Sequence, residues 1–179
     1  MRRIDSKTAI AVASCSALLA VLNAAIAPLF WNLTRLPFAC DIFTFSILIL
    51  VGYWSGRPGA PTATGVTSSL LTLALRPEAL HMLGFLIASI AFDLIFAWRR
   101  GGAFSSDAGA LAFSIVASTI CALIAGLVIG SMVMRIGNVA GIAVFAALHG
   151  VGGALGGLIG FAMVGALKRR GVRPIESKA

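Results

Sequence analysis

The sequence predicts an all-α integral membrane protein, a compact bundle of six transmembrane helices with both termini in the cytoplasm. Three observations lead to this prediction. Apolar residues make up 59% of the 179 residues and charged residues only 11%, with a mean hydropathy of +1.01, whereas a soluble domain needs roughly 25% charged residues. Six apolar stretches are separated by short connections, and basic residues are unevenly distributed among those connections. We expect one domain at residues 1–171 and a short, basic, disordered tail at 172–179.

The apolar stretches define the expected helices. They lie at residues 8–30, 38–54, 62–75, 79–98, 108–134 and 139–167. A helix needs about 20 residues to cross a hydrocarbon core about 30 Å thick, so five of the six are plausible spans. The stretch 62–75 has only 14 residues, and it is either a short span or a re-entrant segment shielded by its neighbours.

Basic residues decide between these alternatives. With six crossings and the N-terminus inside, the cytoplasmic segments hold eleven basic residues: Arg2, Arg3, Lys7, Arg57, Arg99, Arg100, Lys168, Arg169, Arg170, Arg173 and Lys178. The outer connections hold three, namely Arg35, Arg76 and Arg135. This bias is the one that the positive-inside rule predicts. A re-entrant third segment would move Arg99 and Arg100 outside and weaken it, so we predict six crossings.

The net charge of +8 has the same explanation. In a soluble protein it would suggest nucleic acid, but here we interpret the charges as topology signals beside anionic headgroups. The first apolar stretch is too long for a signal-peptide core of about 7–15 residues, so we expect it to remain as a helix. Cys15, Cys40 and Cys121 lack metal-ligand spacing and are interpreted as packing residues.

Small residues recur at helical spacing in two of the stretches. Ala9, Ala13 and Ala17 form a ladder in the first stretch, which either packs within the bundle or docks an external helix. The last stretch carries the glycines Gly152, Gly156 and Gly160 on one stripe, with Gly153 and Gly157 beside it. Such stripes allow close backbone approach, which helps to hold helices together in lipid. For the glycines we favour packing within the bundle.

Ionisable groups inside a membrane are costly and therefore informative. Asp41, near the outer end of the second stretch, either pairs with Arg35 or faces a ligand. For Asp93, near the inner end of the fourth, we favour a structural ion pair with a nearby arginine. His149 is expected in the bundle interior, bonded to a backbone carbonyl or to a ligand.

Polar and aromatic groups concentrate at the outer face, where we expect a small ligand to enter. Our candidate binding residues are Trp31, Asn32, Arg35, Asp41, Glu78, His81, Asn138 and His149. Asn23, Arg76 and Arg135 belong to the same outer group, and Asn23 is interpreted like His149. An aromatic surface with a few convergent hydrogen-bonding groups is typical of small-molecule pockets.

Motifs for catalysis and nucleotide binding are absent. The sequence has no HExxH, GxSxG or P-loop and no paired glutamates on a helix. We therefore expect neither an enzyme nor a resident cofactor or metal, and no ATP-driven transport by this chain alone. Nucleic acid is not an expected partner.

Together these features resemble one family, the substrate-binding S components of energy-coupling factor (ECF) transporters. The ladder of Ala9, Ala13 and Ala17 is similar to that family's docking motif. The segments Leu36-Pro-Phe-Ala-Cys-Asp41 and Gly52-Tyr-Trp-Ser-Gly-Arg-Pro-Gly59, and the ending from His149-Gly-Val-Gly-Gly153 to Lys168-Arg-Arg170, resemble its helix layout. The resemblance covers nearly the whole chain.

The resemblance implies a function in a prokaryotic plasma membrane. An S component binds a water-soluble vitamin or precursor near its outer face and docks on a coupling membrane subunit with two cytoplasmic ATPases. ATP hydrolysis then topples it so that the pocket opens inward. Trp31, the amides and the histidines favour a planar heterocycle. A cobalt or nickel cargo is less expected, because the N-terminus has no histidine to act as a ligand.

Two other functions fit the residues. A self-sufficient small-solute transporter or channel would relay protons through Asp41, Asp93 or His149. A non-transport membrane subunit would bind no ligand, and the glycine stripe of its last helix would contact a partner.

Overall fold

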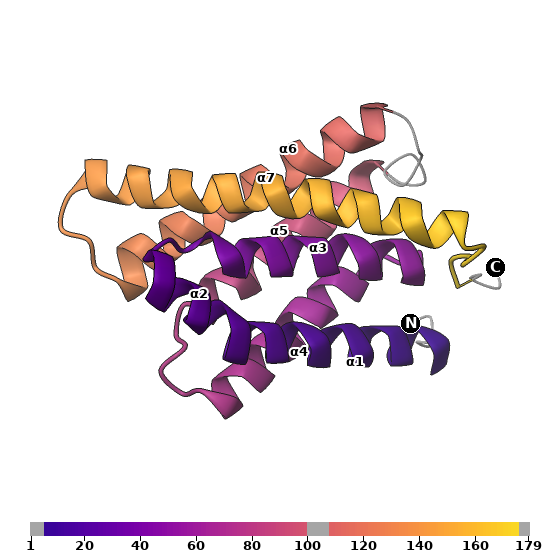
Figure 1. The fold of residues 1–179 in the computed structure, drawn as a ribbon, viewed down its shortest axis with the longest axis horizontal. Coiled ribbons are helices and arrows are strands. Elements are labelled where there is room, and N and C mark those ends of the chain that lie inside the picture. The colour runs from indigo at the N-terminus through magenta and orange to yellow at the C-terminus, as the bar shows by residue number, and fades with distance from the viewer. Residues whose placement is uncertain (1–5, 100–107, 176–179) are drawn as a thin grey trace.

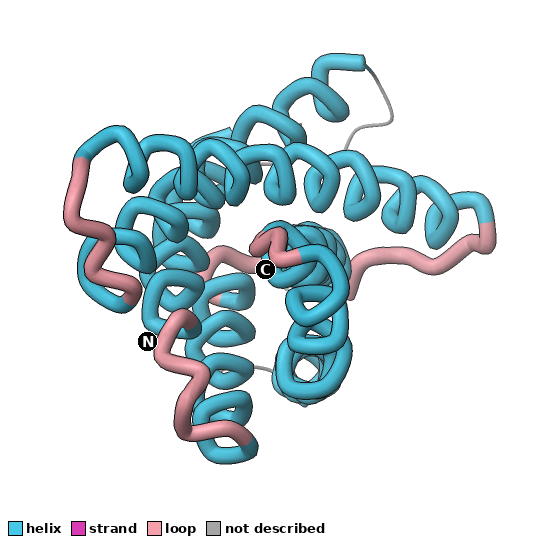
Figure 2. The backbone as a smooth tube through the Cα atoms, turned by 60° about the vertical axis from the view of Figure 1, so that its left-hand side comes forward, coloured by secondary structure: helices cyan, strands magenta, loops and turns pink. Residues whose placement is uncertain are grey.

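The chain folds into long helices joined by short connections. The computed structural model describes residues 6–99 and 108–175, and these contain helices and loops but no strand (Figure 2). In chain order the elements are α1 (Ser6–Val21), the π-helical turn η1 (Leu22–Ile26), α2 (Ala27–Thr34), α3 (Phe38–Ser55), α4 (Ala60–Leu75), α5 (Met82–Arg99), α6 (Ala108–Val128), the π-helical turn η3 (Ile129–Val133) and α7 (Val139–Arg169).

Each predicted apolar stretch coincides with a helical segment. Five segments are long and apolar enough to cross a membrane: Ser6–Thr34, Phe38–Ser55, Met82–Arg99, Ala108–Val133 and Val139–Arg169. Helix α4 has 16 residues, which corresponds to about 24 Å of helix. The all-helical prediction is therefore confirmed, while the crossing of α4 stays a prediction.

Helices of successive segments run in alternate directions, so the bundle has two distinct ends (Figure 1). Both described chain ends lie at one of them, together with the connection 56–59; we call this the terminal end. The connections 35–37, 76–81 and 134–138 lie at the opposite end, which we call the cavity end. Seven of the basic residues predicted to be cytoplasmic are described and belong to the terminal end: Lys7, Arg57, Arg99, Lys168, Arg169, Arg170 and Arg173. Arg2, Arg3, Arg100 and Lys178 lie outside the described residues.

Helix α3 is the most deeply enclosed segment of the bundle. It contacts α1, α4, α5, α6 and α7, and two thirds of it (67%) is buried, more than in any other candidate span. Its neighbours also pack in series, α1 on α4, α4 on α5, α5 on α6 and α6 on α7. Residues presented by α3 therefore face several helices at once.

The glycines of α7 bring it close to two helices. A Cβ atom at Gly152 would lie 2.7 Å from the carbonyl oxygen of Phe38, and one at Gly156 would lie 3.0 Å from that of Asp41 in α3. On the adjacent edge, a Cβ atom at Gly157 would lie 2.7 Å from the carbonyl oxygen of Ser114 in α6. These approaches are possible only without side chains, so the glycine stripe packs within the bundle, as predicted.

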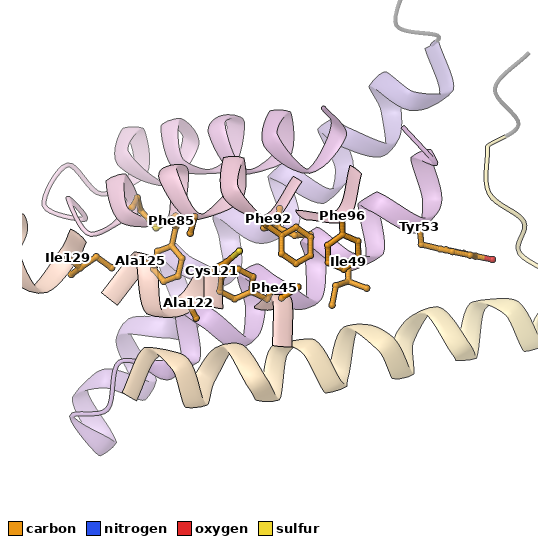
Figure 3. Close-up of a cluster of buried hydrophobic side chains, with 14 of the residues drawn as sticks. Phe45, Ile49, Tyr53, Phe85, Phe92, Phe96, Cys121, Ala122, Ala125 and Ile129 are labelled. Carbon is orange, nitrogen blue, oxygen red and sulfur yellow. The ribbon is translucent and has the colours of Figure 1, made fainter. Parts of the chain in front are cut away.

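An aromatic and aliphatic core fills the bundle between its two ends. Phe45, Phe92 and Phe96 are buried at its centre, and the rings of Phe92 and Phe96 stack with centroids 4.2 Å apart. Figure 3 shows the cluster extending from Phe85 and Ile129 to Tyr53. Since protein cores are close-packed, this cluster separates the cavity end from the terminal end.

Asp93 serves the start of α4. Its Oδ2 accepts hydrogen bonds from the backbone N–H of Gly59 at 2.7 Å and from the hydroxyl of Thr62, also at 2.7 Å. A carboxylate at a helix N-terminus satisfies N–H groups that have no partner within the helix. Asp93 thus has a structural role and joins α5 to α4, while its ion pair with a nearby arginine stays a prediction.

The beginning of the tail is ordered, contrary to the prediction. The hydroxyl of Tyr53 donates to the carbonyl oxygen of Val172 at 2.9 Å, and the N–H of Ile175 donates to the carbonyl oxygen of Trp54 at 2.8 Å. These bonds fasten residues 172–175 to the end of α3, an attachment that the polar, Pro-containing sequence did not indicate.

The glycine contacts lead to a stability prediction. We expect Gly157→Ala to lower the unfolding free energy by about 1–3 kcal/mol, because the added methyl group overpacks the contact with α6. Gly165→Ala is the matched control in the same helix. The nearest atom to its Cβ is a terminal Arg169 nitrogen 3.9 Å away, so alanine there gains helix propensity. Thermal unfolding in detergent measures both, and equal midpoints for the two variants would contradict the packing role.

Candidate ligand-binding cavity

The cavity end of the bundle contains a pocket of about 210 Å³. Its wall is built by η1 and α2, by the 35–37 connection and the start of α3, by the α4–α5 connection and the start of α5, and by η3, Met134 and α7. The lining residues with chemical significance are Asn23, Trp31, Cys40, Arg76, Glu78, His81, Phe85, Phe145 and His149. Small and aliphatic residues from the same elements complete the wall.

Asn23 is placed in the wall by the π-helical turn η1. Its side chain is 1% exposed, and neither Oδ1 nor Nδ2 has a hydrogen-bond partner among the described residues. A π-helical turn widens one turn of a helix and is frequent at functional sites. The second such turn, η3, contributes Ile129 to the same cavity. A buried amide without partners costs free energy, and a partner bound in the cavity would lower that cost.

His149 and Asp41 form a buried pair at the deep side of the cavity. Nδ1 of His149 lies 2.8 Å from Oδ2 of Asp41, and the two side chains are 3% and 0% exposed. His149 lines the cavity, whereas Asp41 lies behind it. Oδ1 of Asp41 and Nε2 of His149 have no hydrogen-bond partner among the described residues. The pair joins α3 to α7 and leaves Nε2 of the ring without a hydrogen-bond partner among the described residues.

Glycines hold this pair in place. A Cβ atom at Gly126 of α6 would lie 3.0 Å from Cβ of His149, and one at Gly152 would lie 2.8 Å from Cβ of Asp41. The backbones of α6 and α7 therefore enclose both side chains tightly. Such packing restricts the rotamers of Asp41 and His149 and orients the imidazole ring.

Aromatic rings surround the imidazole of His149. The ring of Phe145 lies edge-on to it with centroids 4.8 Å apart, and the ring of Phe85 lies 6.0 Å away. His81 in turn contacts Phe85 edge-on at 6.4 Å. Ring pairs at these separations and angles attract each other. Together with Trp31 they give the cavity walls on which a planar ring can stack.

The mouth of the cavity carries an ion pair. Nε of Arg76 donates to Oε1 of Glu78 at 2.7 Å, and both side chains are partly exposed. The neighbouring backbone N–H and the Arg76 guanidinium lower the pKa of Glu78. Burial, and to a smaller extent the charge of Arg76, lowers the pKa of His81 to about 4. His81 is therefore a neutral donor and acceptor at physiological pH.

The structure brings together some of the candidate residues and separates others. Trp31, Glu78, His81 and His149 line the cavity. Asn32 and Arg35 are exposed and outside the lining, because α2 turns them away and Arg35 ends that helix with a positive φ of 58°. Asn138 instead caps α7, its side chain accepting from the N–H of Gly141 at 2.6 Å. Asp41 pairs with His149 and not with Arg35.

Sequence reasoning missed the most distinctive residue of the site. Asn23 was grouped with the outer polar residues but not among the binding candidates, since nothing in the sequence indicates the π-helical turn around it. Phe85 and Phe145 were hidden among the apolar residues of their helices. Helical spacing offers a signal for Phe145, which precedes His149 by four residues and therefore shares its face.

The cavity offers groups for hydrogen bonding and for ring stacking. Among residues 6–99 and 108–175, no group of three or more His, Cys, Asp or Glu side chains is placed to hold a metal ion. Polar atoms without partners, stacking surfaces and a partly open mouth suit the non-covalent capture of a small polar molecule.

Comparison with known proteins identifies the fold. The structure matches a crystal structure described as an S component of an ECF transporter, with a TM-score of 0.71 and 16% sequence identity, over 95% of this chain and 88% of the other. No protein-family model matches the sequence, and a sequence search of curated proteins gives no match. The chain therefore has the fold of an ECF S component, which confirms the resemblance. Together with its five long apolar helices, this makes it a multi-pass membrane protein.

The lowered pKa of His81 leads to a pH prediction. An unfolded histidine titrates near 6.5, whereas folded His81 titrates near 4, so between these values the unfolded chain binds more protons. Stability should therefore be lost as the pH falls from about 6.5 towards 4. We expect the thermal midpoint in detergent to drop between pH 7 and pH 5, and His81→Gln to reduce that drop. Equal drops in both proteins would contradict the assignment.

Proposed function

We propose that this chain is the membrane-embedded substrate-binding subunit of an ECF-type transporter. It captures a water-soluble vitamin or vitamin precursor from outside a prokaryotic cell, and a separate energising module drives the uptake. One observation carries this proposal: a cavity lined by residues with unpartnered polar groups lies at the end of the bundle opposite both described chain ends. The S-component fold supports it.

The proposed orientation places the terminal end in the cytoplasm. Seven described basic residues belong to that end and three, Arg35, Arg76 and Arg135, to the cavity end. This asymmetry favours an outward-facing cavity by the positive-inside rule. Helix α4 then crosses as a short span whose polar ends, capped by Asp93 and by the Arg76–Glu78 connection, lie close to the headgroups.

The docking surface is assigned to the alanine ladder. Ala9, Ala13 and Ala17 are all exposed on α1, so they present a flat strip of helix to the surroundings. Small residues allow a partner helix to approach closely in lipid. We assign this strip to the coupling membrane subunit, which in turn binds two cytoplasmic ATPases.

The other two functions fit the structure less well. A channel or self-sufficient carrier needs a path past the cavity, but Phe45, Phe92 and Phe96 fill the bundle below it. A subunit that binds its partner through the α7 glycine stripe is disfavoured too, because α3 and α6 already occupy Gly152, Gly156 and Gly157. Capture followed by release with the help of a partner is the function that remains.

A co-purification experiment tests the capture role. We expect the chain, purified in mild detergent from cells grown in rich medium, to carry one small molecule detectable by native mass spectrometry. Asn23→Leu and His149→Leu should lose that molecule, since both side chains line the cavity. Ser14→Leu, an exposed position on α1, should retain it. A wild-type chain that carries no small molecule and takes up none from a vitamin mixture would contradict the capture role.

A substitution in the alanine ladder tests docking. Ala13→Trp should abolish co-purification with the coupling subunit while ligand affinity changes less than about twofold, because the ladder is remote from the cavity. Val116→Trp is the matched control, an exposed position on α6. Both proteins are compared by pull-down and by isothermal titration. Loss of ligand binding together with docking would count against a separate docking surface.

A further inference from the structure

The cavity offers hydrogen-bonding atoms in an arrangement that restricts the ligand. Asn23 presents a carbonyl oxygen and an NH₂ group, both buried and both without partners among the described residues. A carboxamide with both groups free forms two parallel hydrogen bonds to a planar edge that carries one donor and one acceptor. An aromatic amine beside a ring nitrogen is such an edge, and asparagine reads adenine in this way.

His149 adds a second requirement for the ligand, and this requirement depends on which ring nitrogen Asp41 faces. While the Asp41 carboxylate is ionised, it only accepts hydrogen bonds, so the Nδ1 that faces it at 2.8 Å then carries the hydrogen. In a neutral imidazole the other nitrogen, Nε2, is then an acceptor. His149 lines the cavity and its Nε2 has no partner. The ligand must therefore bring an N–H or O–H group to this nitrogen.

The volume and the charges of the cavity further restrict the size and the charge of a ligand that fits it. An engineered cavity of about 150 Å³ holds benzene, so about 210 Å³ suits one substituted ring better than a fused ring system. Arg76 is the one lysine or arginine among the lining residues, and Glu78 neutralises it at the mouth. The deep side carries the Asp41 carboxylate. A ligand carboxylate placed there would meet a like charge and find no cation.

We propose that the cavity selects a single-ring aromatic heterocycle, uncharged or cationic, with an amino group beside a ring nitrogen. Asn23 forms two hydrogen bonds to the edge that carries the amino group and the ring nitrogen. His149, held in place by Asp41, accepts a hydrogen bond from the ligand. Asn23 and His149 touch the ligand, and Asp41 is a positioning residue. This inference rests on the proposed capture function and names the chemical class of its cargo.

The first experiment compares ring compounds of similar size. Isothermal titration of the purified chain uses 4-aminopyrimidine, pyrimidin-4-one and pyridine-3-carboxylate as probes. We expect 4-aminopyrimidine to bind at least tenfold more tightly than either of the others, a margin in the range of one bidentate pair. Asn23→Leu should weaken the binding of 4-aminopyrimidine at least tenfold, because it removes the bidentate pair, whereas Ser14→Leu should leave that binding unchanged. Equal or tighter binding of the carboxylate, or no saturable binding of 4-aminopyrimidine, overturns the proposal.

The second experiment tests the positioning role of Asp41. In Asp41→Asn the new amide donates to Nδ1 of His149, so that Nε2 carries the hydrogen; the same exchange in a catalytic triad gives the wrong tautomer. The preference should then shift by at least tenfold towards pyrimidin-4-one, which has a carbonyl oxygen in place of the amino group. A purely structural Asp41 would weaken both probes equally, and that result overturns its positioning role.

The tautomer is also observable without any variant of the site. The chain has two histidines, so labelling with ¹⁵N-histidine and purification through a histidine-free tag gives two imidazole signals, assigned with His81→Gln. At pH 7.5 we expect Nε2 of His149 to resonate as an unprotonated nitrogen. A protonated Nε2, in a neutral or a charged ring, overturns the proposal. The co-purification experiment distinguishes failure of this inference from failure of the proposed function. A bound molecule of another chemical class would support the capture function and contradict the inferred class of cargo.

Discussion

The close backbone contact of α7 with α3 and α6 is the constraint on which the rest of the structure depends. Lipid gives helices little hydrophobic reason to associate, so the glycines of α7 supply the contact area instead. Gly152 and Gly156 meet α3, and Gly157 meets α6. The contact between α3 and α7 also fixes the distance between Asp41 and His149, because Asp41 belongs to α3 and His149 to α7. Packing and site geometry thus have one cause.

This constraint explains why polar atoms remain without partners deep in an apolar bundle. The backbones around Asp41 and His149 are too close for either side chain to turn towards another partner, and the π-helical turn fixes Asn23 in the facing wall. Buried polar groups without partners reduce the stability of the fold. The hydrophobic core below them, centred on Phe92, offsets part of that loss. Residual binding capacity of this kind is typical of a site that a ligand completes.

Much of the fold was predictable from the sequence, because apolar length and basic flanks determine where helices begin and end in a membrane. Trp31, His81 and His149 were predictable as cavity residues from their depth and polarity. Asn23 was not, since a π-helical turn has no sequence signal and shifts the facing of the residues beside it. Nor was the role of Asn138, which serves its own helix N-terminus, because a cap and a ligand group look alike in sequence.

The rigidity of the bundle bears on how a captured molecule would leave. Helices joined through backbone contacts have no loose side-chain layer along which they can slide, and the aromatic core closes the cavity from below. Opening a path inside the bundle would separate α7 from α3 and disrupt the pair of Asp41 and His149. Moving the whole bundle leaves those contacts intact and needs only a surface for a partner. A mechanism in which an external module tilts the entire subunit therefore requires the smaller loss of contact free energy, and the exposed alanine ladder on α1 is a suitable place for that module to act.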